Sequence, residues 1–384
     1  MFNFHIIKTK TAKTKTSAAM HAHPKRVYLL ALLLDLLAIA ANQLAIHSSA
    51  FADAYSHYVY RVLSLGIGSV MGLLPFSVVE LLLYATILFV LFDFVKQLRH
   101  FLGHLFLILS TLLVLYVFLC GINYHRTSFS QEAGLSVTID EHGTVYDEAD
   151  LIALCDYLVT EINDTEAQVE GACIGQTMET PKPSAAWLWH AGRTGQRAME
   201  KLGQRYRRLS GHYPFPKPIL NTWILSVQQT TGVYSPFTVE ANYNRDIAYC
   251  DIPFTICHEL SHLRGYMQEE EANFIGVLAT IGADDLYFNY SGYVSAWVYA
   301  GNALARIDST AFATLYARIN ARTRQDMLYN NAYWQQFEGK PAEAHEQLND
   351  AYLKMQGQAT GVRSYGHVTD LMLEYFAKNG TLTQ

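Results

Sequence analysis

Long apolar runs in the first third of the chain alternate with short polar segments. Residues 27–46, 76–94 and 101–122 are mostly apolar, and about 20 such residues in a helix cross the hydrocarbon core of a bilayer. The intervening residues 54–74 are also apolar, but Arg61 and several glycines interrupt them. Such a segment is typical of an interfacial or re-entrant helix. The pattern therefore predicts a membrane region at residues 27–125 with three spans.

The pattern changes after residue 125 to that of an ordinary globular domain. Residues 126–384 are enough to form one domain with a substantial core. Residues 237–244 alternate apolar and polar positions, as in a half-buried strand, and residues 219–228 also predict a strand. The remaining pattern predicts helices at residues 147–165, 184–209, 253–265, from 269 onward, and at 294–319, 341–356 and 368–377. An α+β fold that is mostly helical in its C-terminal half follows.

Basic residues indicate how the membrane region is oriented. Residues 1–26 carry six Lys and Arg and no acidic residue, and residues 96–100 form a second basic segment between two spans. The positive-inside rule places both segments in the cytoplasm. Three spans of the cytoplasmic membrane then place residues 126–384 on the extracytoplasmic side. Ala50-Phe51-Ala52 resembles a signal-peptidase site, but the first span is longer than the apolar core of a signal peptide, so we expect an uncleaved anchor.

Net charge indicates which molecules the protein can bind, and the positions of the cysteines indicate whether a disulfide can form. The formal net charge of −6 argues against nucleic acid, whereas the basic N-terminal arm suits the anionic lipid of the inner leaflet. Cys120 lies in the third span, and the other four cysteines fall in the extracytoplasmic domain. A disulfide is permitted there, but the sequence leaves its pairing among Cys155, Cys173, Cys250 and Cys257 open.

The most specific chemical pattern is His258-Glu259-Leu260-Ser261-His262. Histidines four residues apart on a helix project from one face and can bind one ion. A catalytic zinc has three protein ligands and keeps its fourth position for water, whose pKa it lowers toward about 7. Glu259, beside the first histidine, is suited to accept the proton of that water as it attacks a carbonyl. This is the arrangement of a zinc metallopeptidase.

Two glutamates are candidates for the third zinc ligand. Gly265 can end the motif helix and let the chain return toward the metal. Gln268 stands where metzincins have a histidine and is a poor ligand for zinc. Glu269 begins Glu-x-x-Ala-Asn, similar to the Glu-x-x-Ala-Asp of membrane zincins whose third ligand is this glutamate. We expect Glu269 in this role, with Glu271 as the alternative, and Asn273 as the group that orients a ligand histidine.

Two further features would complete an active site. The strand expected at residues 237–244 precedes the motif, where zincins hold an extended peptide at a sheet edge; an ordinary sheet strand is the alternative. The oxyanion formed during attack needs a donor such as Tyr, His or Arg. Tyr365 and His367 lie in a polar, glycine-flanked turn and are the first candidates, and residues 289–293 are a second tract.

Several motifs together resemble one bacterial family of membrane proteins grouped as a domain of unknown function. The motifs are Pro75-Phe76-Ser77 and residues 240–244, 253–255, 258–266, 269–274, 290–293, 352–354 and 364–366. The resemblance covers most of the chain and implies N-terminal transmembrane helices followed by a zincin-like domain. This chain departs from the family at His367, where members usually have arginine.

The sequence therefore predicts a membrane-anchored, gluzincin-like metallopeptidase. It would bind Zn²⁺ through His258, His262 and Glu269, use Glu259 as general base, and act on a protein or peptide close to the outer membrane surface. Two alternatives stay open. One is a non-catalytic membrane protein that keeps the zinc fold for binding or sensing, and the other is a zinc amidase acting on cell-wall peptides. The intact Glu259 weighs against the first, because only chemistry needs the base.

Overall fold

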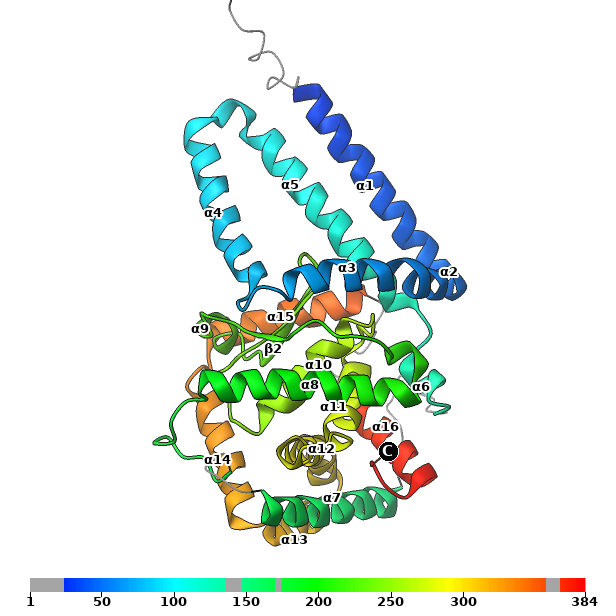
Figure 1. The fold of residues 1–384 in the computed structure, drawn as a ribbon, viewed down its shortest axis with the longest axis vertical. Helices are drawn as coiled ribbons and strands as arrows, with labels where there is room; N and C mark the ends of the chain where they lie inside the picture. Colours follow the sequence, from blue (N-terminus) through cyan, green and yellow to red (C-terminus); the bar gives the residue numbers. More distant parts are fainter. Residues whose placement is uncertain (1–23, 136–146, 170–173, 357–366, 384) are drawn as a thin grey trace, which may run out of the picture.

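The computed structural model describes residues 24–135, 147–169, 174–356 and 367–383. Three long apolar helices rise from a mostly helical body (Figure 1). They are α1 (Pro24–His47), α4 (Val78–Lys96) and α5 (Leu98–Leu119). Residues 27–47, 78–96 and 100–125 are each long and apolar enough to cross a membrane. The three helices expected from the sequence are therefore confirmed, and they indicate that the protein associates with a membrane.

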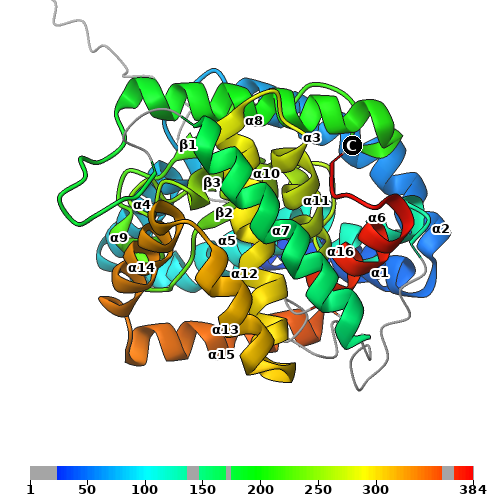
Figure 2. The ribbon, with the colours of Figure 1, turned by 90° about the horizontal axis from the view of Figure 1, so that it is seen from below.

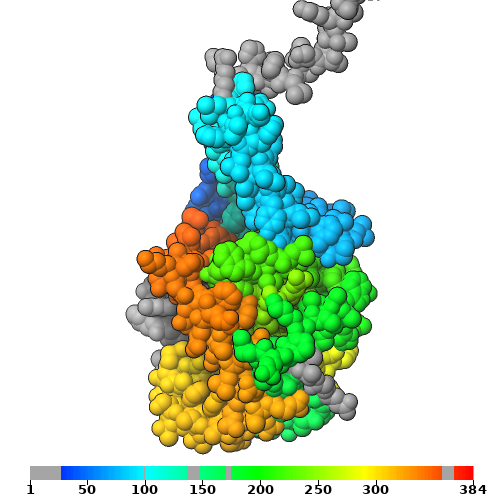
Figure 3. Space-filling view, turned by 90° about the vertical axis from the view of Figure 1, so that its left-hand side faces the viewer, coloured from blue at the N-terminus to red at the C-terminus, as the bar shows by residue number. Residues whose placement is uncertain are grey.

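A further helical segment runs across the lower ends of these helices. It consists of α2 (Ser49–Ala54), a π-helical turn (Tyr55–Tyr60) and α3 (Arg61–Met71), and it lies between the apolar helices and the body (Figure 1). This is the segment that the sequence predicts as an interfacial helix. The connection between α4 and α5 lies at the opposite end, with the start of α1 (Figure 1). The apolar helices form a narrow neck on a broad body (Figure 3).

Helices make up most of the body. They are α6 (Phe129–Glu132), α7 (Glu148–Gln168), α8 (Ala185–Arg205), α9 (Trp223–Ser226), α10 (Asp251–His262), α11 (Glu269–Ile281), α12 (Leu286–Ile307), α13 (Ser309–Arg318), α14 (Ala321–Gln335), α15 (Lys340–Met355) and α16 (His367–Asn379), with 3₁₀ turns at Gly121–His125 and Arg207–Leu209. α10 packs against α11 and α8, and α12 packs against α11 and α7. Figure 2 shows α12 and α7 together on the face of the body away from the apolar helices. α10 and α11 are therefore enclosed on several sides.

A small sheet lies beside α10. β3 (Glu240–Tyr243) is its middle strand, parallel to β1 (Lys217–Pro218) and antiparallel to β2 (Gly232–Ser235). The strand predicted at residues 237–244 is present as β3, but it is fully buried and is not an edge. The strand predicted at residues 219–228 is wrong, because α9 lies there. The carboxylate of Glu80 on α4 accepts hydrogen bonds from the main-chain N–H groups of Leu220 (2.8 Å) and Asn221 (2.9 Å), which fixes this segment outside the sheet.

Buried polar contacts join the apolar helices to the body. Glu240 on β3 accepts hydrogen bonds from the N–H groups of Val78 (3.1 Å) and Val79 (2.9 Å), at the start of α4. The same carboxylate forms a buried ion pair with Lys217. The hydrophobic core also continues across residue 126, since one cluster contains Tyr55, Cys120, Ile122, Ile256 and Leu278. Both parts of the chain therefore support the region around α10.

Candidate metal site

α10 and α11 bring three candidate metal ligands together. Nε2 of His258 lies 3.2 Å from Nε2 of His262 and 3.3 Å from Oε2 of Glu269. One ligand atom from each residue lies within 4.8 Å of the others. α10 places the two histidines one turn apart, and Gly265, with φ of +82°, turns the chain so that Glu269 at the start of α11 faces them. This left-handed turn is a conformation that glycine adopts without strain.

The spacing of these atoms fits a small divalent cation such as zinc. Two ligand atoms at normal bond length from a tetrahedral zinc lie about 3.4 Å apart. The separations of His258 from His262 and from Glu269 agree with this value. Nε2 of His262 is 3.9 Å from Oε1 of Glu269, which exceeds it by about 0.5 Å. Two imidazoles and a carboxylate are also a donor set that zinc accepts.

The protonation of His262 and Glu269 suits a cation as well. Burial lowers the pKa of His262 to about 4, so its ring is neutral near pH 7. Nδ1 of His262 donates a hydrogen bond to the main-chain oxygen of Tyr266 (2.6 Å), which leaves the lone pair on Nε2 free for a metal. Burial opposes the charge on Glu269, but the hydrogen bond and charge of His258, together with His262, hold its pKa below the ordinary value.

His258 is held less firmly than His262. Its Nδ1 is buried and has no hydrogen-bond partner within the described part of the chain. Burial opposes protonation of this ring, but Glu269, Glu259 and the amide of Asn273 together raise its pKa. The structure thus brings Asn273, which the sequence predicts as the orienting group, close to the first histidine of the motif.

Glu259 lies beside the three candidate ligands, at a cavity of about 1190 Å³ that all four residues line. Its side chain is buried, and Oε2 has no hydrogen-bond partner among the described residues. Burial raises the pKa of Glu259 to about 8, and a nearby cation would favour its charged form. A Cβ atom added at Gly232 would lie 2.5 Å from Oε1 of Glu259. The strand against this carboxylate is therefore β2, which the sequence did not predict.

Residues distant in the sequence form the remaining walls of this cavity. α15 contributes Tyr352, whose hydroxyl accepts a hydrogen bond from Tyr116 of α5 (3.0 Å) and lies 3.1 Å from the hydroxyl of Tyr124. α12 contributes Tyr299, whose pKa is raised by burial and by the charge of Glu269. An apolar helix thus reaches the cavity directly.

Other residues proposed from the sequence lie elsewhere. Glu271, the alternative third ligand, faces away from the histidines and accepts a hydrogen bond from the N–H group of Ser130 (3.4 Å). His367 begins α16 and is not among the described residues that line the cavity, and Tyr365 lies outside the described residues. Tyr290, in the second tract, donates to Asp326 (2.8 Å) in the core.

The described cysteines form no disulfide at the candidate site. The four that the structure describes are buried and free: Cys120, Cys155, Cys250 and Cys257. Cys173 lies outside the described residues. No disulfide therefore links the cysteines that the structure describes.

The fold and the site define a protein with three apolar helices of membrane-spanning length and a mostly helical body that holds a candidate metal centre. The model of the family described as protein of unknown function (DUF3810) matches residues 55–373. The match covers more than half of the chain, so the chain belongs to this family. Neither a curated protein nor a solved structure matches the chain. The expected membership in a family of unknown function is confirmed, while the zincin-like fold and the activity stay predictions.

Proposed function

We propose that this protein is a membrane-anchored, zinc-dependent metallopeptidase. The observation that supports this most is the convergence of His258, His262 and Glu269, with Glu259 beside them, at one large cavity. Burying four ionisable side chains together costs folding free energy unless a partner compensates their charges. A divalent cation compensates the two carboxylates and would be bound through Nε2 of each imidazole, with release of any proton on His258.

Each side chain has a defined task in such a reaction. Bound zinc would lower the pKa of a water molecule and polarise the carbonyl of the substrate. Glu259 accepts the proton of the attacking water and returns it to the leaving amine. Tyr299, on the cavity wall near Glu269, is suited to donate its O–H to the developing oxyanion. The bond from Nδ1 of His262 to Tyr266 keeps Nε2 directed at the metal.

The cavity favours a basic peptide as substrate. Apart from Glu259 and Glu269, whose charges the cation compensates, four lining residues are acidic, and no lining residue in the described part of the chain is Lys or Arg; the four are Asp251, Glu338, Glu343 and Glu346. β2 pairs only with β3 among the described strands, so its other edge is suited to hold an extended peptide by strand addition. We therefore expect cleavage next to Lys or Arg.

The position of the basic segments supports an extracytoplasmic site. Residues 96–100 and the start of α1 lie at the end of the apolar helices farthest from the body (Figure 1). The positive-inside rule puts these basic segments in the cytoplasm, so the body and its cavity face outward. The substrate is then a protein or peptide at the outer surface of the cytoplasmic membrane.

Zinc content of the full-length protein in detergent tests the metal site. We expect one zinc per wild-type chain and loss of zinc in Glu269→Ala. Glu271→Ala is the matched control, since it removes a carboxylate two residues away that faces elsewhere, and it should keep its zinc. A folded wild-type protein without zinc, or loss of zinc only in Glu271→Ala, would contradict the assignment.

Glu259→Gln separates an enzyme from a binding protein. The amide cannot accept the proton, so this variant should bind zinc and lose hydrolysis of a basic peptide library. Unchanged biological function in Glu259→Gln would favour the non-catalytic alternative. Cleavage of isolated cell-wall peptides, but of no protein substrate, would favour the amidase.

A further inference from the structure

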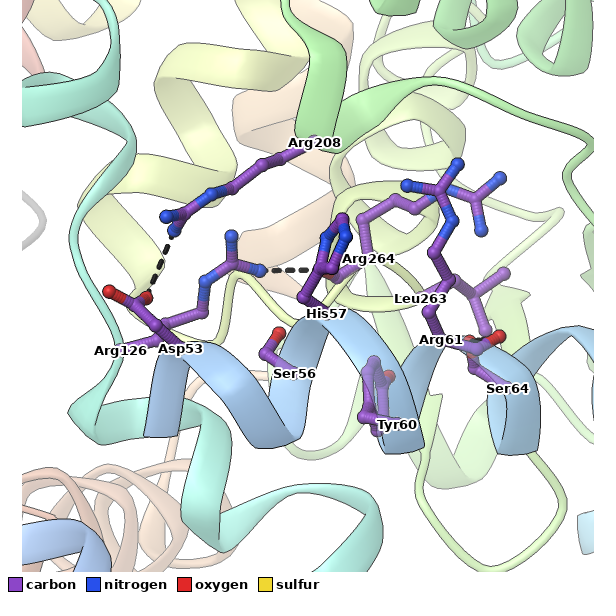
Figure 4. A pocket seen from close by; sticks show the side chains of 10 residues that line it. All are labelled: Asp53, Ser56, His57, Tyr60, Arg61, Ser64, Arg126, Arg208, Leu263 and Arg264. Carbon is purple, nitrogen blue, oxygen red and sulfur yellow. Dashed lines mark hydrogen bonds and ion pairs between the residues drawn. The ribbon is translucent and has the colours of Figure 1, made fainter. Parts of the chain in front are cut away.

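A second pocket lies where the π-helical turn meets the body (Figure 4). Four of its ten lining residues are arginines: Arg61, Arg126, Arg208 and Arg264. They come from α3, from the segment after α5, from the turn after α8 and from the segment after α10. The π-helical turn adds Ser56 and His57. π-helical turns are rare and often occur at functional sites.

Positive charge in this pocket is only partly compensated. Arg208 pairs with Asp53 (3.0 Å) and Glu132 (2.8 Å), and Arg126 pairs with the same Glu132 (3.2 Å). Among the residues that the structure describes, Arg61 donates only to neutral acceptors, the main-chain oxygen and hydroxyl of Ser210. Arg264 likewise donates to a main-chain oxygen, that of His212. Four guanidinium groups thus face two carboxylates within the described residues.

Two buried donors in the pocket are unused. Nε of Arg126 and Nε of Arg264 are buried and have no hydrogen-bond partner in the described part of the chain. The side chain of Arg126 is 5% exposed, and Arg264 as a whole is 5% exposed. A buried charged donor without an acceptor lowers the stability of the folded state. The guanidinium groups lie over tyrosine rings, Arg126 4.2 Å from the ring centroid of Tyr266 and Arg264 4.1 Å from that of Tyr213, so an anion would add the charged partner that neither ring supplies.

Two of the arginines also crowd one another. The terminal nitrogens of Arg61 and Arg264 lie 3.2 and 3.4 Å from the point where a Cβ atom of Gly211 would stand. Burial and the charge of Arg264 both lower the pKa of Arg61. The two like charges disfavour one another, and an anion bound beside both would offset this repulsion.

We propose that this pocket binds a phosphoryl oxyanion. Arginine is the side chain best matched to phosphoryl oxygens, because its planar group donates two parallel hydrogen bonds. The enclosed volume is about 20 Å³, on the scale of one water-sized group, so the end of an anion enters and the rest of the molecule stays outside. The hydroxyl of Ser56 adds a neutral donor at the pocket wall.

Two sources can supply this chemistry. The pocket is bounded by the helical segment directly below the apolar helices (Figure 1), within reach of a phospholipid headgroup. A soluble phosphate compound carries the same oxyanion. The proposal is independent of zinc and of hydrolysis, because it rests on other side chains.

Titration calorimetry on the full-length protein in detergent tests the pocket. The probes are inorganic phosphate and the short-chain lipid dihexanoyl phosphatidylglycerol, and wild-type protein is expected to bind at least one of them. Arg61→Gln and Arg208→Gln should each weaken binding by about ten-fold or more. Arg207→Gln is the matched control, since this exposed arginine has the same charge and does not line the pocket.

The outcomes separate the sources and the alternatives. Lipid binding more than ten-fold tighter than phosphate binding assigns the site to a membrane phospholipid, and equal affinities assign it to a soluble phosphoryl group. Binding of neither probe by wild type overturns the proposal. Equal weakening in Arg207→Gln also overturns it, because general surface charge would then explain the binding. If Arg61→Gln fails to fold, Arg208→Gln and Ser56→Ala decide the question.

Discussion

Gly232→Ala gives a sharp test of the position of Glu259. The new Cβ atom would lie 2.5 Å from Oε1 of Glu259 and 2.8 Å from Cγ2 of Thr255. β2 or the glutamate must move by roughly 0.5–0.9 Å to restore a normal contact, and a displacement near 1 Å at a catalytic group costs up to about 100-fold in rate. Overpacking of this kind also costs about 1–3 kcal/mol of stability. We expect hydrolysis to fall about 10- to 100-fold, while zinc stays bound.

The assay combines zinc content, thermal unfolding and hydrolysis of a quenched basic peptide library by the full-length protein. Gly66→Ala is the matched control, because a Cβ atom there meets nothing within 4 Å, and its activity should be unchanged. Full activity in Gly232→Ala would refute the role given to Glu259. Parallel loss of zinc and activity would refute the expectation that the clash is confined to Glu259, since the whole site would then have collapsed.

Two further predictions concern stability. Lys217→Met leaves Glu240 without its buried cationic partner, so we expect a loss of about 3–5 kcal/mol, measured by thermal unfolding in detergent; Lys201→Met, at an exposed pair, should cost at most about 1 kcal/mol. Burial raises the pKa of Asp251 to about 7 from its ordinary value of 3.8. The folded state therefore binds the extra proton, and its stability falls as pH rises from about 4 to about 7, by at most about 4 kcal/mol. Asp251→Asn should remove this part of the pH dependence, and a pH profile identical to that of wild type would contradict it.

The features predicted best from the sequence depend on residues that are close together along the chain. The three apolar spans follow from composition and length alone. The pairing of His258 with His262 follows from the helical repeat, and the approach of Glu269 needs only the short turn at Gly265. These statements hold without knowledge of which distant segments meet.

The features that the sequence missed depend on distant contacts. Residues 219–228 are rich in apolar and β-branched side chains, as in a strand, but Leu220 and Trp223 are 51% and 63% exposed and Glu80 of an apolar helix binds the backbone there. The role of Gly232 depends on its contact with a carboxylate 27 positions later in the chain. Tyr299 is one of 25 tyrosines, and only the fold places it at the cavity.

The expected boundary at residue 126 leads to a last prediction, for the isolated fragment 126–384. The hydroxyl of Tyr60 donates to the main-chain oxygen of His262 (3.0 Å), and Tyr116 and Tyr124 hold the wall formed by Tyr352. The fragment lacks all of these contacts.

Removal of the first 125 residues would also uncover apolar surface that the body buries. The side chains that leave the shared core include Tyr55, Tyr60, Leu119, Cys120 and Ile122. Each large one contributes about 1.5–3 kcal/mol, and their sum is comparable to the whole stability of an ordinary domain, about 5–15 kcal/mol. We therefore expect the fragment to lack a cooperative thermal transition and stoichiometric zinc, and the full-length chain in detergent to have both. A fragment that unfolds cooperatively and holds one zinc would show that the body is independent of the membrane segment.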